Sequence, residues 1–121
     1  MSLFIRQNVT LHSGEESDFK IECDALTDED IETIACLISK KHAFKKIIAG
    51  PSNGQRLEKA LKQYITPDEY LPVLVIDDVF TTGKSMEELR LKAEEHCTGV
   101  VIFARGECPD WIDPLFQMWE Q

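Results

Sequence analysis

An uninterrupted apolar run at residues 72–76, with the sequence PVLVI, restricts the fold of this chain more than any other feature. A strand formed by this run has two apolar faces, and both must be covered. Such strands are typical of the centre of a parallel sheet with helices on both sides. Two acids, Asp77 and Asp78, follow the run directly, so we expect the strand to end at Ile76.

Helical and extended segments alternate along the rest of the chain. Short apolar runs at 46–49 and 99–104 predict two more buried strands. Apolar residues at helical spacing predict three helices, the first of which begins at a capping box formed by Thr27 and Asp30. The apolar stripes of the helices are Ile31, Ile34, Ala35 and Ile38; Leu57, Ala60, Leu61 and Tyr64; and Met86, Leu89 and Ala93. We therefore expect an α/β fold of three layers, a parallel sheet with helices on both faces.

The two ends of the chain differ from this central pattern. Residues 9–11 and 19–23 have strand character, and turn-forming residues at 12–17 separate them. In the apolar C-terminal tail, Asp113 followed by Pro114 predicts the start of a helix. The tail either packs on the sheet of its own chain or forms an interface with a second copy. We expect one domain with an N-terminal part at about 1–26, a core at 27–106 and the tail at 107–121.

Composition and charge argue against several classes of partner. Thirteen basic and 22 acidic residues give a net charge of −9, whereas a protein that coats nucleic acid needs a basic face. The apolar runs are shorter than the roughly 20 residues that span a membrane, and residues 1–10 do not resemble a secretory signal. The four cysteines and three histidines lack metal-binding spacing. We therefore expect a cytoplasmic protein with reduced thiols, no nucleic-acid or membrane partner and no metal held by the protein alone.

The segment from Asp77 to Ser85 carries the clearest chemical pattern. The acid pair Asp77 and Asp78 precedes a loop with several hydroxyl side chains, and the third predicted helix begins after it. Free N–H groups at a helix start bind anions, and Gly83 allows a phosphate to approach the backbone. Adjacent carboxylates repel phosphate, so they suit sugar hydroxyls or a magnesium ion beside it. The hydroxyl side chains are those of Thr81, Thr82 and Ser85.

Two other interpretations of this segment fit less well. Gly83, Lys84 and Ser85 match the end of a P-loop, but Asp78 occupies the position of its first glycine. Paired aspartates also mark phosphoacceptor sites of receiver domains, where they end an early strand, whereas here they follow a late one.

Residues 73–85, with the sequence VLVIDDVFTTGKS, resemble the phosphoribosyl-pyrophosphate (PRPP) signature of type I phosphoribosyltransferases. The shared pattern is an apolar strand, two acids and then Thr-Thr-Gly-x-Ser. The resemblance implies that Asp77 and Asp78 face the ribose hydroxyls and that Mg²⁺ accompanies PRPP. It also implies which residues hold the 5-phosphate: Thr81, Thr82, Gly83, Lys84 and Ser85.

Other segments are similar to the orotate branch of that family, and the resemblance extends over about 9–106. Residues 10–14, followed by Ser17, resemble the small N-terminal hood of orotate enzymes, in which His12 would contact the base. Arg105 follows the last strand, where those enzymes carry an arginine for the base. Since orotate enzymes are commonly dimers, we expect a homodimer. The pyrophosphate loop of the family falls on Gly50, Pro51, Ser52, Asn53 and Gly54.

The sequence departs from the family in the parts that surround these motifs. About ten residues, 63–72, stand where the family has a mobile basic loop, and they contain two acids and no lysine or arginine. His12 replaces the usual lysine of the hood, and Lys20 and Ile21 replace an aromatic pair. The pyrophosphate loop lacks its lysine, although Arg56 is nearby.

Two functions therefore stay open from the sequence. The first is an enzyme that transfers phosphoribose from PRPP to a small, orotate-like base and releases pyrophosphate, with Arg56 or a second subunit supplying the cation. The second is a catalytically inactive module of the same fold that binds PRPP, a nucleotide or another ribose 5-phosphate ligand.

Overall fold

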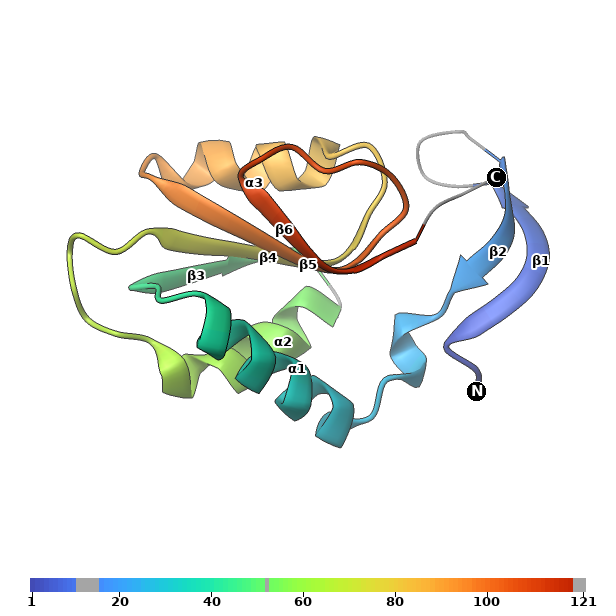
Figure 1. The fold of residues 1–121 in the computed structure, drawn as a ribbon, viewed down its shortest axis with the longest axis horizontal. Helices are drawn as coiled ribbons and strands as arrows, with labels where there is room; N and C mark the ends of the chain where they lie inside the picture. The colour runs from blue at the N-terminus through green and yellow to red at the C-terminus, as the bar shows by residue number, and fades with distance from the viewer. Residues whose placement is uncertain (11–15, 52, 119–121) are drawn as a thin grey trace.

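The computed structural model describes residues 1–10, 16–51 and 53–118. Within these residues a parallel sheet of four strands, in the order β3-β4-β5-β6, forms the centre of the molecule (Figure 1). A separate antiparallel pair, here called the hood hairpin, lies to one side of the sheet (Figure 1). Its strands are β1 (Phe4–Thr10) and β2 (Glu16–Ile21). The sheet strands are β3 (Lys46–Ala49), β4 (Val73–Phe80), β5 (Cys97–Ala104) and β6 (Ile112–Gln117).

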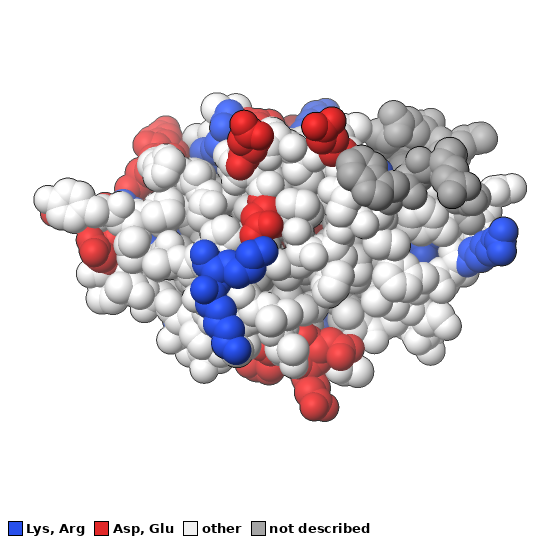
Figure 2. All heavy atoms as spheres, in the orientation of Figure 1, with Lys and Arg blue, Asp and Glu red and all other residues white. Residues whose placement is uncertain are grey.

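Helices cover both faces of the sheet, which confirms the predicted three-layer α/β architecture. Helices α1 (Asp28–Lys41) and α2 (Asn53–Leu61) lie together on one face, and α3 (Lys84–Ala93) lies on the other (Figure 1). The predicted capping box at Thr27 is present at the start of α1. Figure 2 shows acidic side chains at the first turn of α1 and basic ones at its last turn, as the helix dipole favours. Short 3₁₀ turns occur at η1 (Cys23–Ala25) and η2 (Lys62–Tyr64), so α2 ends before Tyr64.

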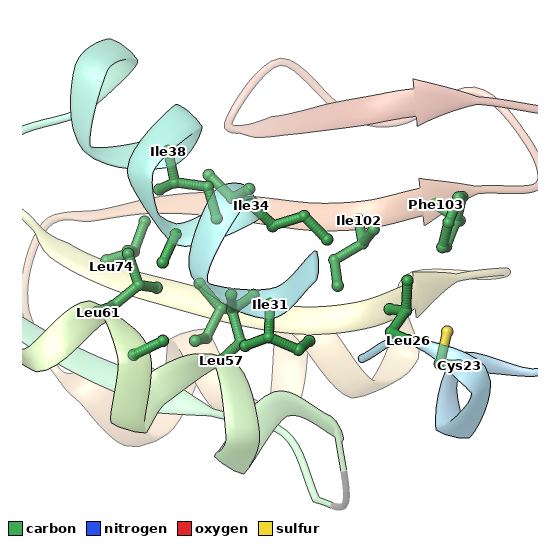
Figure 3. Packing of buried hydrophobic residues seen from close by; sticks show 14 of the residues in the cluster. Cys23, Leu26, Ile31, Ile34, Ile38, Leu57, Leu61, Leu74, Ile102 and Phe103 are labelled. Atoms are coloured by element: carbon green, nitrogen blue, oxygen red, sulfur yellow. The ribbon is translucent and has the colours of Figure 1, made fainter. Parts of the chain in front are cut away.

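Both faces of β4 are buried, as its uninterrupted apolar run predicts. Leu74 and Ile76 pack among the residues of α1 and α2, whereas Val73 and Val75 pack on the side of α3. Figure 3 shows Leu74 next to Leu61 of α2, on the face of the sheet that α1 and α2 cover. Alternating side chains of one strand therefore belong to two separate apolar clusters.

β4 is longer than the sequence predicts, because it continues through the acid pair to Phe80. The expectation that the strand ends at Ile76 is therefore wrong. The register with β5 aligns Asp77 with Val101 and Phe80 with Ala104. Backbone pairing with this long neighbour keeps two aspartates in a strand, although aspartate is uncommon in strands.

The C-terminal tail forms a strand where the sequence predicts a helix. Asp113 and Pro114 lie within β6, which pairs with β5 as the edge of the sheet. An edge strand tolerates proline, since one side of its backbone has no strand partner. Ile112 is buried and Leu115 packs against the core, so the described part of the tail belongs to the sheet and core of its own chain. His42 Nε2 lies 2.8 Å from Asp113 Oδ2 and fastens β6 to the end of α1.

The hood hairpin confirms the predicted N-terminal strands, although β1 begins earlier, at Phe4. The Phe4 ring meets the Phe103 ring of β5 edge-on, with centroids 5.6 Å apart. Most of the predicted turn at 12–17 lies outside the described residues. No helix in the described part of the chain is long and apolar enough to cross a membrane.

Candidate functional site

The loops that follow β3, β4 and β5 meet at one edge of the sheet. The N–H of Gly50, just after β3, donates to Ile76 O of β4 at 2.9 Å. The N–H of Arg105, just after β5, donates to Phe80 O at the end of β4, also at 2.9 Å. Ligands of open α/β sheets bind at this carboxyl edge. The structure thus brings together the three chain segments that the sequence analysis singled out.

A small polar cavity lies inside the loop between β4 and α3. Its volume is about 30 Å³, and residues 79–86 line it. Gly83 has φ +87°, and a Cβ atom there would lie 2.9 Å from the Phe80 ring, so glycine is required at this position. Because α3 begins at Lys84, the N–H groups of its first turn face the loop, and that of Lys84 lies 3.5 Å from Thr82 Oγ1. Hydroxyls and N–H groups around a small cavity are suited to a phosphate group.

The acid pair directly precedes the residues that line this cavity, and Asp77 is the more buried of the two acids. Asp77 is 7% exposed, and its Oδ1 accepts the N–H of Asp78 at 2.9 Å. Burial, together with repulsion from Asp78, raises the pKa of Asp77 to about 7. A Cβ atom on Gly50 would lie 2.7 Å from the Asp77 carboxylate. The close approach of the β3 loop to Asp77 therefore depends on glycine at position 50.

Asn53 connects the acid pair to the chain between the hood hairpin and α1. Its Nδ2 donates to Asp24 Oδ1 at 3.1 Å and to Asp78 Oδ2 at 3.3 Å. The thiol of Cys23, next to Asp24, has its pKa raised to about 12 by burial and by Asp78, so it stays protonated. The sequence analysis did not find Asp24. It is one of nine acidic residues at 15–32, and no local pattern distinguishes it from the others.

The Arg56 guanidinium forms hydrogen bonds with other residues of the chain. Its Nη2 donates to Leu26 O at 2.8 Å and to Asp28 Oδ1 at 3.3 Å. Its Nη1 donates to Asn53 Oδ1 at 3.1 Å. The guanidinium thus joins α2 to the beginning of α1, and this accounts for its orientation.

Arg105 binds the hood hairpin to the core. The residue is 8% exposed, its Nη1 donates to Ser17 Oγ at 2.7 Å, and its Nη2 donates to Phe19 O at 2.9 Å. The Phe19 ring lies over the guanidinium, with 4.1 Å between Cζ and the ring centroid. These contacts hold β2 above the carboxyl edge, while the proposed contact with a base stays a prediction. His12 and Ser52, also predicted at the site, lie outside the described residues.

The short segment at 63–72 lies at the opposite edge of the sheet. The N–H of Thr66 donates to Phe44 O at 3.0 Å, and the N–H of Lys45 donates to Pro72 O at 3.1 Å. Phe44 and Lys45 precede β3, at the amino ends of the strands. This segment therefore cannot cover the acid pair, and it supplies no basic side chain there.

No group of three or more histidine, cysteine, aspartate or glutamate side chains among the described residues is arranged to hold a metal ion. Along the chain, Asp77 and Asp78 precede the residues that line the cavity, and Glu87 and Glu88 follow them.

Comparison with known proteins identifies the fold. No family model and no curated protein matches the sequence. Among solved structures, orotate phosphoribosyltransferase from Aeropyrum pernix matches with a TM-score of 0.68 and 22% identity, over 87% of this chain and 77% of that one. UMP synthase from Leishmania donovani matches with a TM-score of 0.65 and 18% identity, over 85% of this chain but only 29% of that one. Xanthine-guanine-hypoxanthine phosphoribosyltransferase from Helicobacter pylori matches with a TM-score of 0.53 and 14% identity, over 74% of this chain and 89% of that one.

These likenesses show that the chain has a reduced type I phosphoribosyltransferase fold. They agree with the resemblance of residues 73–85 to the PRPP signature.

Proposed function

We propose that this chain binds a ligand that carries a ribose 5-phosphate group at the carboxyl edge of its sheet. One observation carries the proposal: the acid pair within β4 lies just before the loop that encloses a small polar cavity at the start of α3. A phosphate site and a hydroxyl-binding site therefore lie side by side, as a phosphorylated sugar requires. The shared fold with phosphoribosyltransferases supports the same assignment.

Each part of the site has a distinct role in this proposal. The loop at 81–85 holds the 5-phosphate through its hydroxyls and through backbone N–H groups, including that of Lys84. Asp78 accepts hydrogen bonds from the ribose hydroxyls, and so does Asp77 when it is ionised. Mg²⁺ would enter with a diphosphorylated ligand and neutralise part of its charge.

A second candidate function is transfer of the phosphoribosyl group to a small, orotate-like base. The intact acid pair favours it, as does the likeness to orotate phosphoribosyltransferases. In this reaction a nitrogen of the base forms a bond to the anomeric carbon while the bond from that carbon to pyrophosphate breaks. Negative charge builds on the departing pyrophosphate, so its stabilisation by a cation controls the rate.

The arrangement of the described residues supports binding better than transfer. The basic side chain nearest to the predicted pyrophosphate loop, Arg56, is already bonded to Leu26, Asp28 and Asn53. The segment at 63–72 lies at the other edge of the sheet. Transfer would therefore need a cation from a partner, such as a second subunit in a homodimer.

Calorimetric titration with PRPP and with ribose 5-phosphate, each with and without Mg²⁺, tests the proposal. We expect at least one ligand to bind the wild type and the Asp77→Asn/Asp78→Asn variant to lose that binding. The matched control, Asp68→Asn/Glu69→Gln, removes two charges from the segment at the opposite edge and should bind as the wild type does. Absence of heat with every ligand at millimolar concentration would refute the proposal, and pyrophosphate release with candidate bases would establish transfer.

A further inference from the structure

Two carboxylates lie at the start of α2, and both already accept hydrogen bonds from the same side chain. The amide nitrogen of Asn53 donates to two carboxylates at once, those of Asp24 and Asp78, at 3.1 and 3.3 Å. Asn53 is 6% exposed. Its amide therefore cannot turn to a ligand without leaving both carboxylates without this donor.

The one arginine in this network does not cancel its charge. Arg56 contacts the oxygen of Asn53 and the carboxylate of Asp28. Three carboxylates, those of Asp24, Asp28 and Asp78, thus belong to a network with a single guanidinium. Arg56 balances one of these three charges, so the network keeps a net negative charge.

Two backbone N–H groups among the described residues of the loop at 50–54 are already bonded within the chain. The N–H of Gly50 donates to Ile76 O at 2.9 Å, and the N–H of Gly54 donates to Pro51 O at 3.4 Å. Gly50 lies against the Asp77 carboxylate, since a Cβ atom there would be 2.7 Å from it. The described part of the loop at 50–54 therefore lies against carboxylates, whereas no carboxylate lines the cavity at 79–86.

The position of the proposed ligand connects this network to ligand choice. In ribose 5-phosphate the anomeric carbon lies across the sugar ring from the phosphorylated C5 arm. One amide nitrogen contacts both Asp24 Oδ1 and Asp78 Oδ2, at 3.1 and 3.3 Å, so Asp24 lies close to any sugar that is bound at the acid pair, and an anomeric substituent on that side of the sugar approaches it. A diphosphate would bring several negative charges against the carboxylates there, and a bound Mg²⁺ would neutralise only part of them. A hydroxyl or a neutral base would meet no such repulsion.

We propose that the site selects phosphoribosyl ligands whose anomeric substituent is uncharged, such as ribose 5-phosphate, over PRPP. The inference rests on the proposed ribose 5-phosphate site and narrows its ligand class. It assigns Asp24 a role in specificity, acting against the diphosphate by charge.

Competitive titration of the full chain with intact PRPP and with ribose 5-phosphate tests this inference, with and without Mg²⁺. Phosphorus NMR verifies that PRPP stays intact during the measurement. We expect ribose 5-phosphate to bind at least about tenfold more tightly than PRPP, and inorganic pyrophosphate not to compete with it. Asp24→Asn should improve the affinity for PRPP about tenfold while changing that for ribose 5-phosphate little. The matched control Glu69→Gln removes one charge at the far edge and should change neither affinity.

The outcomes separate this inference from the proposed function. Tighter binding of PRPP than of ribose 5-phosphate, dependent on the acid pair, would overturn the selectivity and leave the phosphoribosyl site standing. Failure of both ligands to bind would overturn both. If Asp24→Asn does not fold, the ratio of the two affinities in the wild type still decides the question.

Discussion

Replacing Asp77 with asparagine should stabilise the fold at neutral and alkaline pH while removing ligand binding. The Asp77 side chain is 7% exposed, and its Oδ1 accepts the N–H of Asp78. Asparagine has nearly the same shape and keeps an oxygen for that hydrogen bond. The variant therefore removes the buried charge with little other change, and the gain in stability measures what that charge costs.

The expected size follows from the pKa of Asp77. Burial, together with Asp78, raises this pKa from 3.8 to about 7. Each pH unit corresponds to ~1.4 kcal/mol, so ionised Asp77 lowers the free energy of unfolding by at most ~4 kcal/mol at high pH. Part of the raised pKa comes from repulsion that Asp77 shares with Asp78 and not from the burial of Asp77 alone. We therefore expect about half of this upper limit, a gain of about 2 kcal/mol for Asp77→Asn at about pH 8. For a chain of this size that corresponds to a rise of about 6–10 °C in Tm.

The direction of the pH dependence identifies the cause. Below pH 3.8 the carboxyl is protonated in both the folded and the unfolded chain, so the wild type and the variant should be about equally stable. The stability of the wild type should then fall relative to the variant as pH rises through about 7.

Urea denaturation of both proteins over this pH range measures the difference, with Asp68→Asn as the control for loss of an exposed acid. A difference in stability that does not grow with pH would refute the reasoning. Retained binding in the stabilised variant would show that this carboxylate does not serve the ligand.

Three further predictions concern other parts of the structure. Gly83→Ala should destabilise the fold by about 1–3 kcal/mol, because it combines a positive φ with a clash against Phe80; urea denaturation measures the loss, and calorimetry should show weaker ligand binding. Arg105→Met should leave the sheet folded but raise amide hydrogen exchange in the hood hairpin about tenfold or more, and equal protection would contradict the clamping role. Asp113→Asn should cost about 0.5–1 kcal/mol at neutral pH. The pKa of Asp113 is lowered mainly by hydrogen bonds from His42 and Lys41, against the opposing effect of burial, so the wild type should lose this stabilisation as pH falls below 3.8. Thermal melts of both proteins from neutral to acidic pH check this, and no loss in the variant at neutral pH would contradict it.

Much of the fold could be predicted from local patterns. The apolar run at 72–76 predicts a strand buried on both faces, and the structure places its side chains in two apolar clusters. The capping box at Thr27 predicts the start of α1. Such features depend on residues only a few positions apart, so neighbouring sequence is sufficient to recognise them.

Features that depend on a distant partner could not be predicted in this way. Asp113 and Pro114 are favourable at a helix start, but the free edge of β5 offers backbone partners and the segment becomes β6. In the same way, β4 continues through its acid pair because β5 runs beside it. A helix start or a strand end is a local preference, and hydrogen bonding to a neighbouring strand overrides it.

The central strand, the alternation of helices and strands, and the acid pair with its hydroxyl loop can all be recognised in the sequence, since each is a pattern of adjacent residues. The surroundings of the acid pair depend on the tertiary structure. It brings Asp24 and Asp78 to the same amide of Asn53, and it joins Arg105 to Ser17, 88 positions earlier in the chain. The charge around a ligand and the direction of a buried guanidinium follow from packing between remote segments, and no local pattern encodes them.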